Sequence, residues 1–250
     1  RPDNMDSYDL VLQGLEYAKK GNVMKENTQK AVELFEKAIK LEPSYARAHA
    51  WRACTLSNLA DWEESPDPKI FENAFKSIQL ALELDSNEPE VHRIMGALKL
   101  WHERDHEMAR YHFEKARELC PSDVFIISRY AIMLIYFGEF DKALQELERA
   151  KRLDPFSHDL LFGPEAICHY WLDNPEEALQ TFKKVKVKKN FLFYIALANE
   201  KSGNNDKASE NLKEAYALTG MDNDSFIGSQ PFKDQELTSK LKIELSNITV

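Results

Sequence analysis

The sequence predicts an all-α fold in which about six pairs of antiparallel helices stack on one another as an α-solenoid, followed by one C-terminal helix. Alanine recurs at intervals of 30 to 43 residues, and at fixed distances from each alanine come an apolar residue, a second small residue and a helix breaker. Glycine is scarce, at 8 of 250 residues, which argues against a loop-rich or all-β chain.

The repeat is anchored by six alanines. They are Ala31, Ala74, Ala109, Ala143, Ala178 and Ala208. Four residues after each anchor stands a bulky apolar side chain, in order Phe35, Ile78, Phe113, Leu147, Phe182 and Leu212. Seven residues after each anchor comes another alanine, or Val185 in the fifth repeat. Spacings of four and seven place all three residues on one stripe of a helix, so this stripe is the predicted buried face.

A second small residue precedes each anchor, at twelve or thirteen residues in four repeats and further back across the insertions 21–27 and 63–69 in the first two. These residues are Gly14, Ala53, Gly96, Ala131, Ala166 and Ala196. Small side chains at both positions let two helices approach closely. A breaker or turn residue twelve positions after each anchor ends the second helix: Pro43, Ser86, Pro121, Pro155, Asn190 and Gly220.

The expected helices follow from this register. The pairs are 5–20 with 28–41, 44–62 with 69–84, 88–103 with 106–119, 123–137 with 141–153, 158–171 with 175–186, and 191–202 with 205–218. The pattern stops after Gly220. Pro231 then opens a segment in which Leu237, Leu241 and Leu245 form one apolar stripe, so residues 233–248 predict a helix that covers the end of the stack.

These recurring positions resemble the sequence pattern of the tetratricopeptide repeat family. The fourth repeat matches the family pattern over its full length, with Ala131, Gly138, Ala143, Leu147, Ala150 and Pro155. The resemblance implies a right-handed superhelix over residues 1–220 and a linker with a capping helix over 221–250. Its repeats would span about 7–43, 46–87, 88–122, 124–156, 158–189 and 190–220.

The resemblance also implies where a partner would bind. In this family the first helices line a concave groove, and transferring the register places seven candidate binding residues there: Arg93, Phe125, Ser128, Ile132, Ile135, Tyr170 and Phe193. The expected function is a non-catalytic scaffold that binds a peptide or helix, with Arg93 orienting an acidic group. The Lys and Asn pair with which some members hold a C-terminal carboxylate is absent. A competing interpretation is that these side chains pack on neighbouring helices or lie under the chain's own tail.

A narrower resemblance favours a second function class. The opening Pro2-Asp3-Asn4, the turns at Pro43 and Pro155, and Pro231-Phe232-Lys233-Asp234 are similar to the C-terminal repeat region of bacterial class III adenylate or guanylate cyclases and of some winged-helix regulators. That resemblance implies a regulatory or dimerisation module, with any cyclase activity residing in another part of a longer polypeptide. The first residue is Arg1 and not Met, which we interpret as a cut from such a polypeptide.

Two motifs carry possible chemistry. His102-Glu103-Arg104-Asp105-His106 satisfies the zinc-protease string H-E-x-x-H, but the register puts a helix boundary between the two histidines, so we expect a polar turn with no metal or cofactor and no catalysis. His92 and His112 stand without Cys or Asp partners at ligand spacing and are expected at the surface or between helices.

Five lysines in residues 183–189 could bind an acidic partner, or simply be a solvated helix end.

Composition bounds the partner and the compartment. The net charge of −9 makes nucleic acid a poor partner, and the longest apolar run, Tyr130 to Phe137, is far shorter than the roughly 18 residues that span a bilayer. Three widely spaced cysteines, Cys54, Cys120 and Cys168, suit packed thiols in a reducing compartment. We therefore expect a cytoplasmic protein whose partner is a protein or peptide segment, either of another molecule or of the same chain. The sequence indicates no particular oligomeric state.

Overall fold

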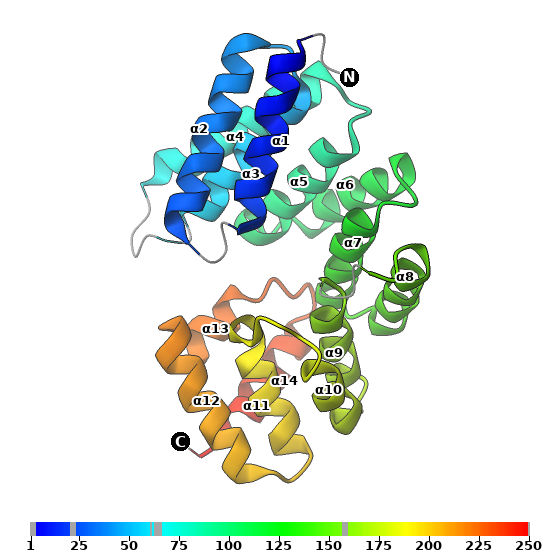
Figure 1. Ribbon diagram of the computed structural model, residues 1–250. Coiled ribbons are helices and arrows are strands. Elements are labelled where there is room, and N and C mark those ends of the chain that lie inside the picture. The colour runs from blue at the N-terminus through cyan, green and yellow to red at the C-terminus, as the bar shows by residue number, and fades with distance from the viewer. Residues whose placement is uncertain (1–3, 21–23, 61, 63–66, 157–159, 250) are drawn as a thin grey trace. The chain divides into compact units, whose positions relative to one another are not determined.

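The chain is all-α, as predicted, and Figure 1 shows its helices running as consecutive pairs. The structure is a computed structural model that describes residues 4–20, 24–60, 62, 67–156 and 160–249. Within those ranges it contains no β-strand. The chain forms two compact units, Arg1–Cys120 and Pro121–Val250, with three helix pairs in each. The fold is therefore the predicted assembly of six tetratricopeptide-type pairs with a helical C-terminal segment.

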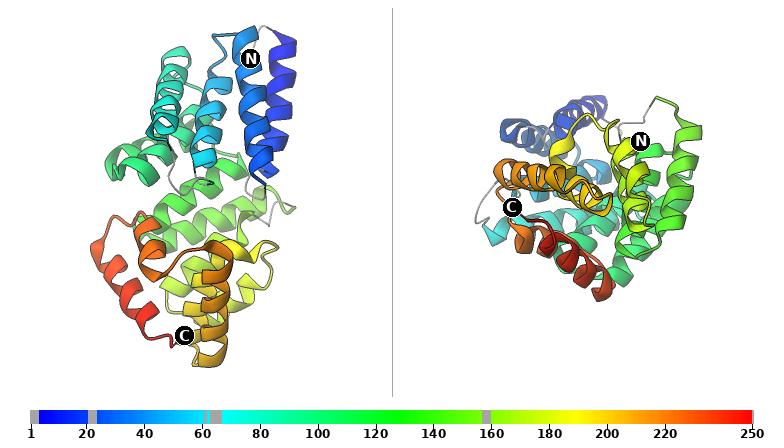
Figure 2. Two further views of the ribbon diagram at one scale, coloured as in Figure 1. Left: turned by 90° about the vertical axis from the view of Figure 1, so that its left-hand side faces the viewer. Right: turned by 90° about the horizontal axis from the view of Figure 1, so that it is seen from below.

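The first unit contains the first three pairs. Its helices are α1 (Met5–Lys20), α2 (Lys25–Leu41), α3 (Ala46–Ala60), α4 (Pro68–Leu84), α5 (Pro89–Leu98), the π-helical turn η1 (Lys99–Glu103) and α6 (His106–Leu119). Consecutive helices pack against each other, and Figures 1 and 2 show α1 and α2 side by side over their whole length. The bounds agree with the predicted pairs to within a few residues.

The six anchor alanines lie where the two helices of each pair contact each other. Ala31, Ala74 and Ala109 are fully buried. The small residue on each first helix faces the bulky residue on its partner helix: a Cβ atom added to Gly14 would lie 2.7 Å from Cε1 of Phe35, and one added to Gly96 would lie 2.9 Å from Cδ2 of Phe113. Glycine at these positions therefore allows the close helix approach that the spacing predicted.

The helix ends lie where capping residues and prolines place them. Helix α2 ends two residues before Pro43, because proline cannot continue the hydrogen-bonded helix. Helix α4 starts with Pro68 in its first turn, and the side chain of Asp67 accepts a hydrogen bond from the backbone N–H of Lys69 at 3.0 Å. The two predicted insertions, 21–27 and 63–69, lie partly outside the described residues.

The second unit repeats the arrangement. Its helices are α7 (Val124–Tyr136), α8 (Phe140–Leu153), α9 (Phe162–Trp171), α10 (Pro175–Phe182), the 3₁₀ turn η3 (Lys188–Phe191), α11 (Leu192–Lys201), α12 (Asn205–Thr219), α13 (Asn223–Ser229) and α14 (Gln235–Ser246). Ala143, Ala178 and Ala208 are buried here as their counterparts are in the first unit. One apolar cluster joins α9 to α14, so this unit has a continuous core.

Helix α10 is shorter than predicted. We expected it to extend to residue 186, but it ends at Phe182; residues 183–187 form a turn, and the last two lysines of the run, Lys188 and Lys189, start η3. Val185 is buried within this turn, whereas all five lysines are exposed. Closely spaced like charges and the β-branched residues Val185 and Val187 disfavour a further helical turn, so the lysine run is a solvated segment beyond the helix end.

The C-terminal segment, residues 221–249, contains two helices where one was predicted. Helix α14 confirms the predicted stripe, because Leu241 and Leu245 are buried. Helix α13 lies in the stretch that we expected to be a linker. It is short, and its buried residues Phe226 and Ile227 are adjacent, so they produce no helical periodicity that a sequence pattern could reveal. Asp222 caps it by accepting a hydrogen bond from the N–H of Ser225 at 2.8 Å.

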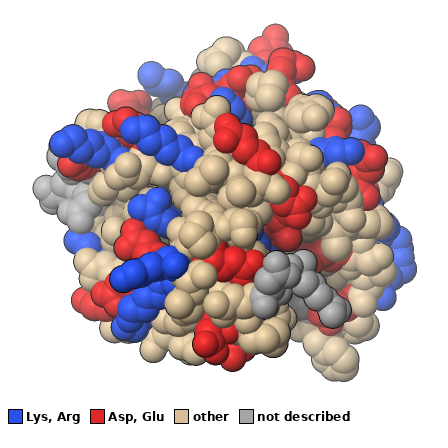
Figure 3. All heavy atoms as spheres, turned by 90° about the horizontal axis from the view of Figure 1, so that it is seen from above, with Lys and Arg blue, Asp and Glu red and all other residues tan. Residues whose placement is uncertain are grey.

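Charge is dispersed on the surface that Figure 3 draws. Acidic and basic side chains lie among uncharged ones, which leaves no broad area of one sign among the residues described on that face. In the described part of the chain, no helix combines the length and the apolar character needed to cross a bilayer.

Candidate binding face of the second unit

The seven predicted groove residues fall into two groups. Arg93 belongs to α5 of the first unit. The other six belong to the second unit, on α7, α9 and α11, which are the first helices of its three pairs. All seven residues therefore lie on first helices of the predicted pairs, six of them in the second unit.

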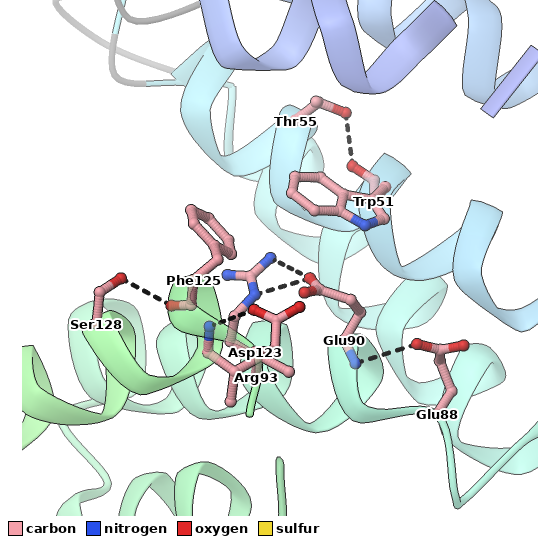
Figure 4. A network of polar contacts seen from close by, with 9 residues as sticks. Trp51, Thr55, Glu88, Glu90, Arg93, Asp123, Phe125 and Ser128 are labelled. Carbon is pink, nitrogen blue, oxygen red and sulfur yellow. Dashed lines mark hydrogen bonds and ion pairs between the residues drawn. The ribbon is translucent and has the colours of Figure 1, made fainter. Parts of the chain in front are cut away.

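Arg93 is already engaged by a carboxylate of its own helix. Its side chain is buried, its Nε donates a hydrogen bond to Oε2 of Glu90 at 2.8 Å, and its guanidinium lies 5.0 Å from the centre of the Trp51 ring (Figure 4). Burial acts to lower the pKa of Arg93, but the charges and hydrogen bonds of Glu90 and Cys54 together more than offset this, and the net shift is upward. An acidic group of a partner would have to compete with Glu90 for this cation.

The two histidines of the H-E-x-x-H string belong to different helices, as the register predicted. His102 lies in η1 and His106 starts α6. The ring of His102 packs on Phe71 with centroids 4.6 Å apart, and its Nε2 hydrogen-bonds Oγ of Ser57 at 2.6 Å. No group of three or more metal-ligating His, Cys, Asp or Glu side chains occurs among the described residues. The motif therefore takes part in helix packing.

His92 and His112 form a buried pair between α5 and α6. Their Nδ1 atoms are 2.9 Å apart, and Nε2 of His92 lies 2.9 Å from the carbonyl oxygen of Ser86. If Nε2 of His92 donates to that carbonyl, its Nδ1 accepts and Nδ1 of His112 donates. Burial, with a smaller contribution from His92, lowers the pKa of His112 to about 4. Both rings are therefore interhelical, one of the two placements expected from sequence.

We define the first-helix face as the surface formed by α7, α9 and α11 in the second unit. Four of its six predicted binding residues are buried, namely Ser128, Ile135, Tyr170 and Phe193. Phe125 and Ile132 on α7 are half-buried. The hydroxyl of Ser128 donates to the carbonyl oxygen of Phe125 at 2.7 Å, so it is satisfied within its helix (Figure 4).

Helix α13 covers the start of α11 with an aromatic contact. The ring of Phe226 stacks on Phe193, with centroids 4.0 Å apart and an angle of 4° between the planes. It also meets the edge of Tyr194 at 5.7 Å. Phe193, which the sequence assigned to partner contact, is thus in contact with the chain's own C-terminal segment.

The link between α13 and α14 fills the space between the ends of α7 and α9. The ring of Phe232 meets Tyr136 at 5.3 Å and Trp171 at 5.4 Å, in both cases edge to face. The backbone N–H of Lys233 donates to the carbonyl oxygen of Tyr136 at 2.9 Å. The side-chain oxygen of Gln230 accepts hydrogen bonds from Tyr136 and Tyr194 at 3.3 and 3.4 Å.

Helix α14 completes the cover with one apolar and one ionic contact. Leu237 lies against Gly138, where an added Cβ would be 3.3 Å from Cδ1 of the leucine. At the other end of the helix, the carboxylate of Glu244 accepts a hydrogen bond from the phenol of Tyr170 and lies 3.3 Å from Nζ of Lys201. The C-terminal segment therefore contacts all three first helices.

Burial fixes the protonation of the phenol in this contact. Burial, reinforced by the negative charge of Glu244, strongly raises the pKa of Tyr170. Tyr170 thus remains a neutral donor at physiological pH, while Glu244 supplies the acceptor and Lys201 the counter-charge. The ammonium of Lys201 also lies 4.5 Å from the centre of the Tyr170 ring.

Several residues of this face were not found from the sequence. Tyr136, Trp171 and Lys201 are at the C-terminal ends of the three first helices, beyond the positions that the family pattern marks as inward-facing. The three residues share one position: each is the last residue of its helix and directly precedes the turn between the two helices of a pair. Glu244 gave no signal, since it is a charged residue beside an apolar stripe.

Comparison with known proteins identifies the repeat. A family model described as tetratricopeptide repeat matches residues 25–45, which include the whole of α2 and the turn that follows it. No curated protein matches the sequence. Nothing in these comparisons favours the cyclase or winged-helix regulator resemblance.

Solved structures with the same fold cover most of the chain. PilW, a widely conserved type IV pilus biogenesis factor, has a TM-score of 0.62 at 19% identity, covering 86% of this chain and 94% of PilW. PilF of Pseudomonas aeruginosa has a TM-score of 0.57 at 18% identity, covering 94% and 98%. A tetratricopeptide repeat protein from Parabacteroides merdae has a TM-score of 0.58 at 14% identity, covering 98% and 86%. At these identities the likeness establishes the fold.

Proposed function

Because this chain is a tetratricopeptide-repeat protein in its repeat pattern and its fold, we propose that it is a non-catalytic protein–protein interaction scaffold whose first-helix face binds a protein segment. The observation that carries the proposal is the C-terminal segment itself. Aromatic stacking, a backbone hydrogen bond and an ion pair hold one peptide segment against three successive first helices. A surface that holds one segment in this way is chemically suited to hold another.

The accessible part of the face would make the first contact with a partner. Phe125 and Ile132 are half-buried about two turns apart on α7, and the guanidinium of Arg129 lies 4.8 Å from the Phe125 ring centre. Apolar side chains bordered by a cation suit an amphipathic segment with an acidic residue. Of the predicted binding residues in the second unit, these two need the least rearrangement.

We place this scaffold in a reducing compartment, with the cytoplasm as the proposed location. None of the three cysteines forms a disulfide, and Cys168 is buried in the core of the second unit. Burial strongly raises the pKa of the Cys168 thiol, so it is a packing residue and not a nucleophile.

The proposal is tested by a charge placed on the face. Ile132→Asp should lower the recovery of co-purifying partner by at least about tenfold, because it puts a carboxylate into an apolar contact. The matched control is Leu153→Asp, since Leu153 is an exposed apolar residue on a second helix, α8. Both variants should melt within a few degrees of the unmodified chain. Equal recovery with the two variants would refute the assignment of this face.

A further inference from the structure

The contacts of the C-terminal segment extend beyond those of a helix that only caps the last pair. A cap needs contacts with α11 and α12, the final pair. Here Phe232 and the backbone of Lys233 bind the end of α7, Lys240 lies over Trp171 of α9 at 5.7 Å, and Glu244 pairs with Lys201 of α11. The segment runs across three repeats, as a ligand of a tetratricopeptide face would. Figure 1 shows α14 passing behind α11 beside α9.

We propose that residues 221–249 are an intramolecular ligand of the first-helix face, and that an external partner must displace them. This rests on the proposed function. The partner that fits has the same chemistry: an aromatic residue that enters between Tyr136 and Trp171, followed by an amphipathic helix with a carboxylate about three turns later for Tyr170 and Lys201. In the resident segment these two residues are Phe232 and Glu244.

The chain connection suits a segment that can detach. Helix α12 ends at Thr219, and the residue that caps it, Gly220, has a left-handed backbone with φ 72° and nothing within 4 Å of an added Cβ. The next two residues, Met221 and Asp222, are exposed. A change of direction at this junction would therefore meet no packed side chain.

The segment itself is amphipathic. Phe232, Leu241 and Leu245 are buried, whereas the outward side of α14 is exposed and includes Ile243 at 62% exposure. After detachment the helix would keep its mainly polar outer side. The aromatic residues of the first-helix face would then become accessible. Because the segment is tethered, its effective concentration is on the order of millimolar, so the closed state excludes weak ligands.

The first experiment uses hydrogen exchange in the unmodified full chain, read by mass spectrometry. A displaceable segment opens locally, so amides of α13 and α14 should exchange at least about tenfold faster than those of α9 and α11, and with less dependence on denaturant. Equal exchange in the four helices, with equal denaturant dependence, would show that the segment unfolds only with the repeats and would overturn the proposal.

The second experiment offers the segment in trans. A fluorescein-labelled peptide of residues 221–249 is titrated into full chains and followed by anisotropy. Phe232→Ala weakens the resident copy, so this chain should bind the peptide at least about tenfold more tightly than the unmodified chain. Ile243→Ala, on the exposed side of α14, is the matched control and should bind as weakly as the unmodified chain. If Phe232→Ala keeps its fold and still does not bind the peptide, the proposal is wrong.

A charge exchange identifies the contact. Lys201→Glu added to the Phe232→Ala chain should abolish binding of the unmodified peptide and restore binding of a peptide with Glu244→Lys. Binding that ignores both charges would contradict the proposed register, and a dimer in sedimentation would mean that a second copy supplies the segment. The outcome of this charge exchange is separable from the test of the proposed function, because that test changes Ile132, which is not part of the Lys201–Glu244 pair.

Discussion

The phenol of Tyr170 donates a hydrogen bond to the carboxylate of Glu244, which joins residues 74 positions apart in the sequence. Tyr170 belongs to the first helix of the fifth repeat, whereas Glu244 belongs to the final helix. The same carboxylate is also close to Lys201 of the sixth repeat. One acidic side chain thus links the C-terminal segment to two repeats.

Removing this hydrogen bond should loosen the segment. Tyr170→Phe should lower the free energy of unfolding by about 1–2 kcal/mol, because Glu244 loses one partner but keeps Lys201. The measurement is urea unfolding of the full chain. Tyr17→Phe is the control, since Tyr17 is partly exposed on α1, and it should change the value by no more than about 0.5 kcal/mol. Equal stabilities of the two variants would show that the bond contributes nothing.

The repeat register makes a second prediction at Ala143, which is fully buried in α8. Ala143→Phe should destabilise the protein by about 1–3 kcal/mol or more, because a phenyl ring must be placed between two packed helices. Lys142→Phe introduces the same ring one residue earlier, where the side chain is exposed, and should be nearly neutral. Melting curves compare the two. An unchanged melting temperature in Ala143→Phe would show that the register is wrong.

The glycine column gives a third prediction. Gly96→Ala should destabilise the protein by about 1–3 kcal/mol, because the new methyl group would lie 2.9 Å from the buried ring of Phe113. Gly228→Ala in α13 places the same methyl group where nothing lies within 4 Å, and should be neutral or stabilising through helix propensity. Chemical unfolding of both variants provides the comparison, and the same sign of change in both would contradict the close approach at Gly96.

Local periodicity was sufficient to predict the helix pairs. Ala31, Phe35 and Ala38 lie on one buried stripe, as do their counterparts in later repeats, because the spacing of four and seven is a property of the helix and needs no information about distant residues. The same is true of Leu241 and Leu245. Where a short helix lacks such a stripe, as with Phe226 and Ile227 in α13, we predicted a linker.

The occupant of the first-helix face could not be predicted in the same way. The contact between Phe232 and Trp171 depends on the path of the whole C-terminal segment, and no repeating pattern links two residues so far apart. Arg93 illustrates a related limit. Its helix position predicted an inward-facing residue that would bind an acidic group of a partner. In the structure its guanidinium is paired instead with Glu90 of the same helix. Periodicity predicts which side chains are buried and leaves open what buries them.

The buried histidine pair predicts a pH dependence. The pKa of His112 in the folded protein is about 4, below its ordinary value of 6.5, so the unfolded chain binds the proton more tightly. Stability should therefore be unaffected by this group above about pH 6.5 and fall as the pH is lowered towards 4, by up to about 3 kcal/mol.

The groups that face the ring are His92, Tyr111 and, through its charge, Lys99. In His112→Gln, whose amide can still donate to His92, the loss of stability between pH 6.5 and 4 should be smaller by a comparable amount. Melting temperatures measured over this range for both proteins test it, and parallel profiles would show that the pair does not couple protonation to unfolding.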